Sequence, residues 1–300
     1  MKQPVFRDYL GPLRPPFLLI NISIVASGAG TAFWRNGTLN ALDVLLALAG
    51  AILAHISVNS LNEYSDFRTG VDSHTIRTPF SGGSGTLQRI PALAPYALGV
   101  GLVSAGITAL IGIYFIQARG PAILPVGLAG LALVLLYTPW ITRNALLCLL
   151  APGLGFGTCM VIGTDLVLGG SYSTAGIFAS LVPFFLVSNL LLLNQFPDVK
   201  ADRKAGRRNI VITKGLRFGA VVYTVFEIGA FASVIAAVVL GVFPKLALLA
   251  LLPLPLAIRA CVGAFRDGNS IKRLTPALGM NVVVNLAMPA LLAAGLFLGR

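Results

Sequence analysis

Charged side chains are scarce in this 300-residue chain. Only 11% of the residues are Asp, Glu, Lys or Arg, whereas a soluble globular domain carries about 25%. Hydrophobic residues make up 56% of the chain, and the mean hydropathy is +0.87. Apolar runs of about 20 residues recur along the whole length, and each is long enough to cross a hydrocarbon core of about 30 Å. The composition excludes a soluble protein and predicts an integral membrane protein with several spans.

Cysteine is also rare. The chain has three, Cys148, Cys159 and Cys261, and all lie inside apolar runs without the spacing of metal ligands. We therefore interpret them as small core residues rather than as a zinc site or a disulfide framework. We expect no cleavable secretory signal, since no small-residue cleavage site follows the first apolar run. We expect that run to be a permanent span.

Nine apolar segments are long enough to form transmembrane helices. Helices are expected because lipid cannot satisfy unpaired backbone groups, and because the runs are too long and continuous for barrel strands. With so few residues outside them, we expect residues 1–300 to form a single all-α integral membrane domain. The predicted spans are 13–33, 41–61, 92–115, 121–141, 144–164, 174–195, 217–240, 243–263 and 275–298.

Basic residues are distributed unevenly along this predicted topology. Eighteen of the 22 Lys and Arg lie before the first span or near the loops that follow even-numbered spans, and the other loops hold four. Loops rich in Lys and Arg stay in the cytoplasm. We therefore expect a cytoplasmic N-terminus, an external C-terminus and a location in the cell (inner) membrane.

The ten acidic residues are concentrated where the basic residues are densest. Half of them fall after the second and sixth spans: Glu63, Asp66, Asp72, Asp198 and Asp202. Membrane orientation and contact with anionic lipid explain basic residues on this side, but they do not explain the carboxylates. Surface ion pairs, worth about 0–1 kcal/mol each, are an alternative explanation for one such cluster. A second, matching cluster argues against it.

The two acidic clusters are similar in sequence. "LNEYSDFRTG" at 61–70 aligns with "LNQFPDVKAD" at 193–202, so that Leu, Asn, Glu or Gln, an aromatic residue, a small or turn residue and Asp recur in order. Asp66 and Asp198 are 132 positions apart, an interval that contains four predicted helices. We therefore expect two similar four-helix units, each with an acidic motif after its second helix, plus a ninth helix.

The spacing within the first motif is helical. Asn62 and Asp66 are four residues apart, so their side chains stack on one face of a helix. Asn59 and His55 extend this polar face into the membrane. Gly70 supplies a place for the helix to end and for the chain to turn back.

The second motif repeats this spacing with Asn194, Asp198 and Asp202. Both motifs lie at the C-terminal end of a predicted helix, where the helix dipole is negative and disfavours carboxylates that lack a cation. Carboxylate and amide oxygens suit hard divalent cations. Mg²⁺ fits best, because it takes one or two carboxylates and completes its shell with water and phosphate oxygens. Arg and Lys nearby suit a polyanion. The pattern predicts an amphiphilic ligand with a diphosphate head and a lipid tail.

At these motifs the sequence resembles the UbiA superfamily of membrane prenyltransferases, nine-helix proteins that transfer an isoprenoid chain from an allylic diphosphate to an acceptor. The family's first motif, an Asn followed by spaced aspartates, is similar to Asn62, Asp66 and Asp72 here. Its second, D-x-x-x-D followed by A-G-[RK], is similar to Asp198, Asp202 and the following "AGRR". The wider "NEYSDFRTGVD" looks most like the branch that prenylates dihydroxynaphthoate, often called MenA-like.

The resemblance implies an Mg²⁺-dependent prenyltransferase with a cytoplasmic active site. Its partners would be a prenyl diphosphate, a small acceptor and the lipid bilayer, with no nucleic acid; the oligomeric state stays open. The implied metal ligands are Asn62, Asp66, Asp72, Asn194, Asp198 and Asp202. The implied diphosphate ligands are Asn59, Arg77, Arg143, Lys200 and Lys204. The implied catalytic residues are Asp66, Asp198 and His55.

The acceptor is less well defined than the donor. An aromatic quinone precursor such as 1,4-dihydroxy-2-naphthoate is expected, and 4-hydroxybenzoate, another aromatic or a polar lipid precursor are alternatives. Two departures from the branch pattern keep them open: "RTPFSGGSGTL" follows the first motif, and Asn209 stands where Thr is common. A transporter would need acids near the bilayer centre, and a CDP-alcohol phosphotransferase would need a compact D-x-x-D-G-x-x-A-R run. Both are less favoured.

Four polar residues inside predicted spans have more than one explanation. His55 is expected either to position the acceptor or take a proton, or to make a packing hydrogen bond. Glu227 is a lone acid in the seventh span, and such residues are often functional. Asn281 and Asn285 are four residues apart in the ninth span and are equally expected as interhelical hydrogen-bonding groups.

Overall fold

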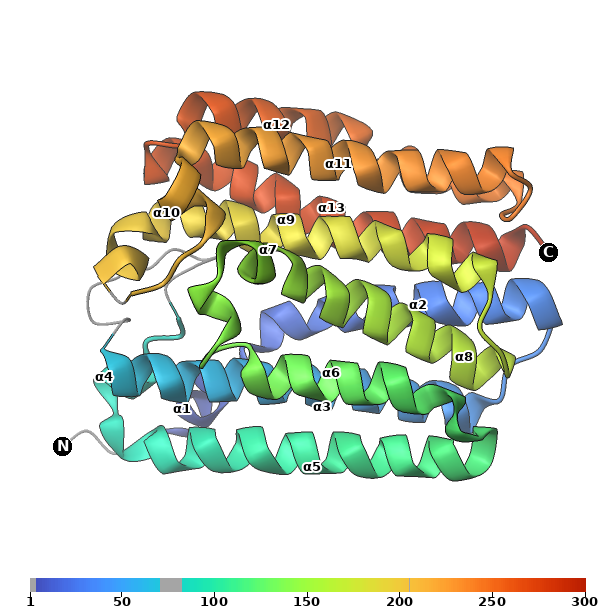
Figure 1. The fold of residues 1–300 in the computed structure, drawn as a ribbon, viewed down its shortest axis with the longest axis horizontal. Coiled ribbons are helices and arrows are strands. Elements are labelled where there is room, and N and C mark those ends of the chain that lie inside the picture. Colours follow the sequence, from blue (N-terminus) through green and yellow to red (C-terminus); the bar gives the residue numbers. More distant parts are fainter. Residues whose placement is uncertain (1–3, 71–82, 205) are drawn as a thin grey trace.

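The computed structural model describes residues 4–70, 83–204 and 206–300, and its regular elements in these ranges are all helices. The all-α prediction is confirmed. Figure 1 shows the long helices side by side along one axis, with α10 and α4 at one end of the bundle and the C-terminus at the other. The α-helices are α1 (Phe6–Leu10), α2 (Pro15–Asn36), α3 (Ala41–Thr69), α4 (Thr86–Arg89), α5 (Ala94–Arg119), α6 (Leu124–Leu136), α7 (Ala145–Gly153), α8 (Gly163–Gly169), α9 (Thr174–Lys204), α10 (Ile210–Lys214), α11 (Leu216–Val239), α12 (Leu254–Asp267) and α13 (Ile271–Leu298).

Eight helical segments in the described part of the chain are long and apolar enough to cross a bilayer. Each coincides with one of the predicted spans. The remaining predicted span, 121–141, corresponds to a shorter apolar helix, Pro121–Leu136. The eight segments are Pro15–Asn36, Ala41–Thr69, Pro91–Arg119, Ala145–Gly169, Thr174–Lys204, Leu216–Val239, Lys245–Asp267 and Ile271–Leu298.

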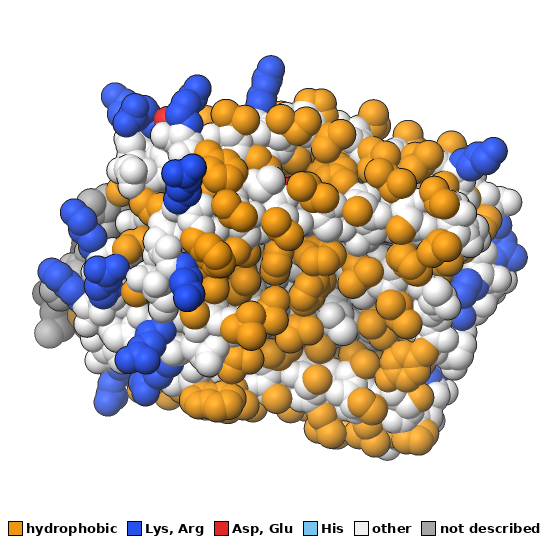
Figure 2. Space-filling view, turned by 45° about the horizontal axis from the view of Figure 1, so that its top comes forward, with side chains coloured by type: hydrophobic (Ala, Val, Ile, Leu, Met, Phe, Trp, Pro, Cys, Tyr) orange, Lys and Arg blue, Asp and Glu red, His pale blue; other side chains and the backbone are white. Residues whose placement is uncertain are grey.

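The surface matches this membrane assignment. Figure 2 shows apolar side chains over the middle of the molecule, while Lys and Arg gather mainly at the end that holds α10. Large apolar side chains such as Leu110, Val225 and Ile258 are exposed along α5, α11 and α12. Apolar side chains on the outside of a helical bundle contact lipid rather than water. The protein is therefore an integral membrane protein.

The helices that carry the two acidic motifs are longer than predicted. α3 extends to Thr69 and α9 to Lys204, so Asp66, Asp198 and Asp202 lie on these helices. α3 ends at Gly70, whose φ of 74° lies in the left-handed region that glycine adopts without strain. The predicted helix end at Gly70 is confirmed. The position of Asp72 lies outside the described residues.

Close packing positions one wall of the bundle interior. Between α7 and α8 the chain forms a π-helical segment, η6 (Leu154–Ile162), which packs against α9. A side chain at Gly157 would collide with the backbone of Phe184 on α9. Glycine is therefore needed for this approach. The adjacent Phe156 lines the cavity of the candidate site.

Candidate active site

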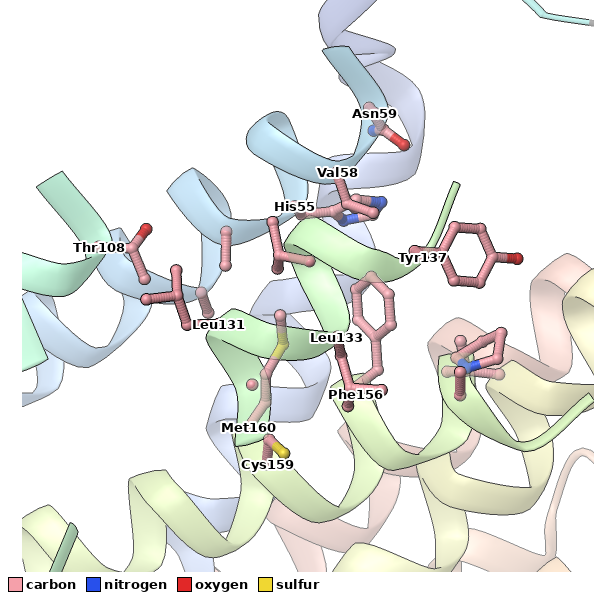
Figure 3. Close-up of a pocket in the computed structure, with 18 of the residues that line it drawn as sticks. His55, Val58, Asn59, Thr108, Leu131, Leu133, Tyr137, Phe156, Cys159 and Met160 are labelled. Carbon is pink, nitrogen blue, oxygen red and sulfur yellow. The ribbon is translucent and has the colours of Figure 1, made fainter. Parts of the chain in front are cut away.

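A cavity of about 670 Å³ lies between helices α2, α3, α5, α6, α9 and α13 and the η6 segment. Most of its wall is apolar, and Figure 3 shows part of that wall with Leu131, Leu133 and Phe156. Its polar lining includes six residues of the two motif helices: Asn59, Asn62, Asp66, Asn194, Asp198 and Asp202. A cavity with a largely apolar wall and a few polar groups suits an amphiphilic ligand, which has a polar head and an apolar tail.

The two motifs meet at one guanidinium group. Arg207 Nη2 donates a hydrogen bond to Asp66 Oδ1 on α3, and its Nη1 donates to Asp202 Oδ1 on α9 at 3.0 Å. Asn209 Nδ2 donates to the second oxygen of Asp202 at 3.2 Å. The two acidic motifs therefore face each other across this shared partner.

Sequence reasoning did not single out Arg207 and Asn209 as site residues. α9 ends at Lys204, and Gly206 adopts a positive φ of 75°, which reverses the chain. The backbone N–H of Arg207 then donates to the carbonyl of Asp202 at 3.0 Å, so the arginine folds back over the motif. Gly206 followed by Arg207, just after the second motif, is the sequence signal that could have identified this arginine.

Arg207 stays charged in this site. Burial alone would lower its pKa, but the carboxylates of Asp66 and Asp202 raise the pKa above the usual arginine value. Its guanidinium neutralises two acidic groups that would otherwise repel each other. It is the cation that the two carboxylates share in this structure.

The amide side chains of the motifs are oriented by their NH₂ groups. Asn62 Nδ2 donates to Thr138 Oγ1 at 3.2 Å, and Asn59 Nδ2 donates to the carbonyl of Leu13 at 3.2 Å. Asn194 Oδ1 is buried and accepts no hydrogen bond from any residue that the structure describes. Because a buried amide oxygen without a partner is costly, this oxygen is suited to a bound cation.

The residues at this end of the cavity fit a magnesium ion. They supply carboxylate and amide oxygens, the donors that hard cations prefer, and Arg207 already bridges two of them as a cation. In the described ranges, no three His, Cys, Asp or Glu side chains form a ready-made metal cluster. The predicted ligand Asp72 lies outside these ranges.

Residues 23–297 match the UbiA prenyltransferase family. The chain belongs to this family. It is 27% identical over 302 residues to the 1,4-dihydroxy-2-naphthoate octaprenyltransferase of Mycobacterium leprae, covering 93% of each chain. It is also 27% identical over 315 residues to the enzyme of that name from Mycobacterium tuberculosis, covering 98% of each chain. The protein is thus an enzyme of the prenyltransferase class.

Solved structures of UbiA homologues have the same fold. An apo homologue from Aeropyrum pernix K1 superposes with a TM-score of 0.70 at 17% identity, covering 93% of this chain and 97% of that one. A homologue from Archaeoglobus fulgidus bound to DMAPP and Mg²⁺ gives a TM-score of 0.59 at 15% identity, covering 95% and 99%. At these identities the likeness concerns the fold.

Three of the four basic residues expected to bind diphosphate do not line the described cavity. Arg143, Lys200 and Lys204 are exposed and do not line the part of the cavity that the structure describes. Arg77 lies outside the described residues. Arg14 and Arg207 line the cavity instead.

Glu63, in the first acidic cluster, does not line the described cavity. It is fully buried and accepts hydrogen bonds from Arg14 Nε at 2.9 Å and from the backbone N–H of Ser84 at 2.6 Å. It therefore joins the start of α2 to the segment before α4. Arg14 itself has a positive φ of 51°, so this ion pair holds a strained backbone at the helix start.

His55 lies in the cavity wall and also makes a packing contact. Its Nδ1 lies 3.0 Å from Asn21 Nδ2, and its ring packs edge-on against Phe156 with centroids 4.6 Å apart. Figure 3 shows His55 below Asn59 on the same helix face, as the motif spacing predicts. The packing hydrogen bond expected for His55 is present, and the side chain also lines the cavity; its action on the acceptor stays a prediction.

Glu227, Asn281 and Asn285 belong to a buried polar network behind the cavity. Asn189 Nδ2 donates to Glu227 Oε1 at 3.2 Å, and Tyr223 Oη donates to Asn281 Oδ1 at 3.2 Å. These contacts join α9, α11 and α13. Glu227 does not line the described cavity, whereas Asn285 does.

Proposed function

We propose that this protein transfers a prenyl chain from an allylic prenyl diphosphate to an aromatic acceptor of the 1,4-dihydroxy-2-naphthoate type, in an Mg²⁺-dependent reaction. The observation that carries the proposal is the meeting of the two acidic motifs at Arg207, at the polar part of a largely apolar cavity. The names of the mycobacterial relatives support this acceptor. The homologue bound to DMAPP and Mg²⁺ supports the donor and the metal.

The acidic and amide oxygens of both motifs would hold the metal: Asn62, Asp66, Asp72, Asn194, Asp198 and Asp202. Bound Mg²⁺ would neutralise charge on the diphosphate as the carbon–oxygen bond to the prenyl group breaks. Arg207 would exchange its carboxylate partners for phosphate oxygens, to which guanidinium groups bind in bidentate geometry. Arg14 lines the same cavity, with its charge paired to Glu63.

The apolar part of the cavity would protect the reacting prenyl carbon. Apolar side chains exclude water, which would otherwise capture an allylic cation. The aromatic faces of Phe156 and Tyr137 line this cavity and would stabilise positive charge through cation–π interaction. His55 lies on the first motif helix, α3, and its ring packs against Phe156; we propose that it acts on the acceptor there.

We further propose nine spans, with the motif end of the bundle in the cytoplasm. Pro121–Leu136 is the short apolar helix that would complete the count. Lys and Arg gather at the motif end of the surface in Figure 2, which supports a cytoplasmic N-terminus and active site in an inner membrane. The exposed Arg143, Lys200 and Lys204 would attract the diphosphate to this side.

The test uses proteoliposomes containing the purified protein, a radiolabelled prenyl diphosphate series and a panel of acceptors. The panel contains 1,4-dihydroxy-2-naphthoate, 4-hydroxybenzoate and a glycerol phosphate lipid precursor. We expect labelled product with the naphthoate, loss of product in EDTA, and recovery with Mg²⁺. Product formed only with another acceptor would overturn the acceptor assignment, and product formed equally in EDTA would overturn the metal requirement.

A further inference from the structure

Two polar side chains lie among apolar ones in the middle of the cavity wall. His55 on α3 and Asn285 on α13 both line the cavity and are 7% and 1% exposed. Their neighbours in the wall include Ile20, Leu190 and Leu286. A prenyl tail makes no hydrogen bonds, and buried polar groups are costly without a partner. The two side chains therefore indicate a ligand with polar atoms at this depth.

His55 and Asn285 lie at nearly the same depth in the bundle. Asn21 on α2 contacts His55, and Ser27 Oγ, further along α2, donates to the carbonyl of Pro289 on α13 at 2.9 Å. α2 and α13 pack together and run in the same direction in Figure 1. Asn21 precedes Ser27 by six positions and Asn285 precedes Pro289 by four. At 1.5 Å per residue their depths differ by about 3 Å.

The hydrogen bonds already made decide what each side chain offers. Asn285 Nδ2 donates to the carbonyl of Asn281 at 3.0 Å and to its Oδ1 at 3.2 Å. Asn285 Oδ1 accepts no hydrogen bond from any described residue, so it is available as an acceptor. Asn21 Nδ2 can only donate to His55 Nδ1. His55 Nε2 must then carry the hydrogen, which makes it a donor.

We propose that His55 and Asn285 form the subsite that orients the aromatic acceptor. One ring hydroxyl of a dihydroxylated aromatic would donate to Asn285 Oδ1, and its other ring oxygen would accept from His55 Nε2–H. His55 lies seven residues before Asn62, or about 10 Å further into the membrane. The ring would therefore sit just beyond the diphosphate, beside Phe156. This inference rests on the proposed function and adds the residues that recognise the acceptor.

The test compares three acceptors in wild type and in Asn285→Leu at saturating prenyl diphosphate. One acceptor is 1,4-dihydroxy-2-naphthoate, and the others are its two analogues that each lack one hydroxyl. For wild type we expect a KM at least about tenfold higher for one analogue, since a buried polar group is left unpaired. Asn285→Leu should abolish that preference, while the KM for prenyl diphosphate stays unchanged.

A second pair of variants tests the donor. His55→Gln keeps a side-chain N–H that can reach the cavity, and His55→Leu removes it. We expect His55→Gln to retain most of the discrimination between dihydroxylated and monohydroxylated acceptors. His55→Leu should lose the discrimination at the ring oxygen that accepts from His55, which Asn285→Leu leaves intact. This readout is a ratio of KM values within one variant, so it does not depend on how much protein folds.

Asn189→Leu is the matched control, because it makes the same change in the same buried network away from the described cavity wall. It should keep the wild-type preference between acceptors. If Asn285→Leu also keeps that preference, Asn285 Oδ1 binds only water and the subsite is wrong. If wild type prenylates no aromatic acceptor at all, the proposed function fails, and the inference fails with it.

Discussion

Acidic side chains occupy both ends of the helical bundle, and their surroundings differ. At the end opposite the motifs, Asp165 accepts hydrogen bonds from Thr31 Oγ1 at 2.7 Å, Ser173 Oγ at 2.6 Å and Arg35 Nη2 at 3.3 Å. These partners come from α2 and from the residue before α9. Asp165 is 1% exposed and does not line the described cavity. Its carboxylate holds helices together.

At the motif end, the acids face the cavity and share a cation. Asp66 and Asp202 both bind Arg207, which sits on the chain beyond α9 rather than on a long helix. Asn194 Oδ1, in the lining of the same cavity, has no partner among the described residues. Carboxylates that brace a fold have several fixed partners. The carboxylates of Asp66 and Asp202 instead share one guanidinium, and Asp202 has Asn209 as a further partner.

The largest expected effect separates these two kinds of acid. Asp202→Asn removes half of the charge that Arg207 now bridges and one proposed metal ligand, so we expect kcat/KM for prenyl transfer to fall about 10³-fold. Asp165→Asn makes the same change at the other end and should leave kcat within about twofold per folded molecule. Radiolabelled prenyl transfer, normalised to folded protein, measures both. Equal losses in the two variants would contradict the distinction between the ends.

The sequence predicted the helices and the helical spacing of the motifs for clear physical reasons. Apolar runs of about 20 residues have few alternatives in a membrane, and all overlap the helices of the structure. The four-residue spacing of Asn62 and Asp66 requires a helical face, and both side chains line the cavity. The helix ends were predicted too early, because polar residues that face a cavity resemble a loop in a hydropathy pattern.

Other parts of the site depend on contacts between distant segments. Glu63 and Asp66 look alike in sequence, but Glu63 pairs with Arg14 and is buried away from the cavity. Arg207 reaches Asp66 only because the chain reverses after α9. Lys200 lies on the motif helix but points outward. Which charged residues enter the site is decided by these tertiary contacts, which spacing along one helix does not contain.

Arg207→Gln tests whether this guanidinium substitutes for a metal. The variant leaves two carboxylates close together without their shared cation, so we expect prenyl transfer to fall about 10- to 100-fold. In EDTA its Tm should fall below that of wild type. Mg²⁺ should raise the Tm of the variant more than that of wild type, because the ion then has no competing cation. Thermal unfolding in detergent, with and without Mg²⁺, measures this.

Lys204→Gln is the control for Arg207→Gln, since it removes a nearby exposed charge that has no place in the described cavity lining. Its Tm should respond to Mg²⁺ as the wild type does. An identical Mg²⁺ response in Arg207→Gln and wild type would show that metal and guanidinium do not occupy overlapping positions.

Asp165→Asn should reduce stability more than activity. The change leaves the partly buried Arg35 guanidinium without its carboxylate, and we expect a loss of about 1–3 kcal/mol in the free energy of unfolding. Chemical denaturation in detergent micelles measures it. Asn36 lies next to Arg35 on α2 and is exposed, so Asn36→Leu should reduce the free energy of unfolding by less. An Asp165→Asn variant as stable as wild type would show that the Asp165 carboxylate does not stabilise this end of the bundle.

The smallest effects are expected from the exposed lysines at the motif end. Lys200 and Lys204 do not line the described cavity, and exposed charges act through water and are screened by salt within about 10 Å. Lys200→Gln should therefore raise the KM for prenyl diphosphate less than about threefold, and the effect should vanish in high salt. Lys245→Gln removes the same charge from the opposite end and should have no effect. A loss that persists in high salt would mean that Lys200 binds the diphosphate directly, as the motif resemblance implied.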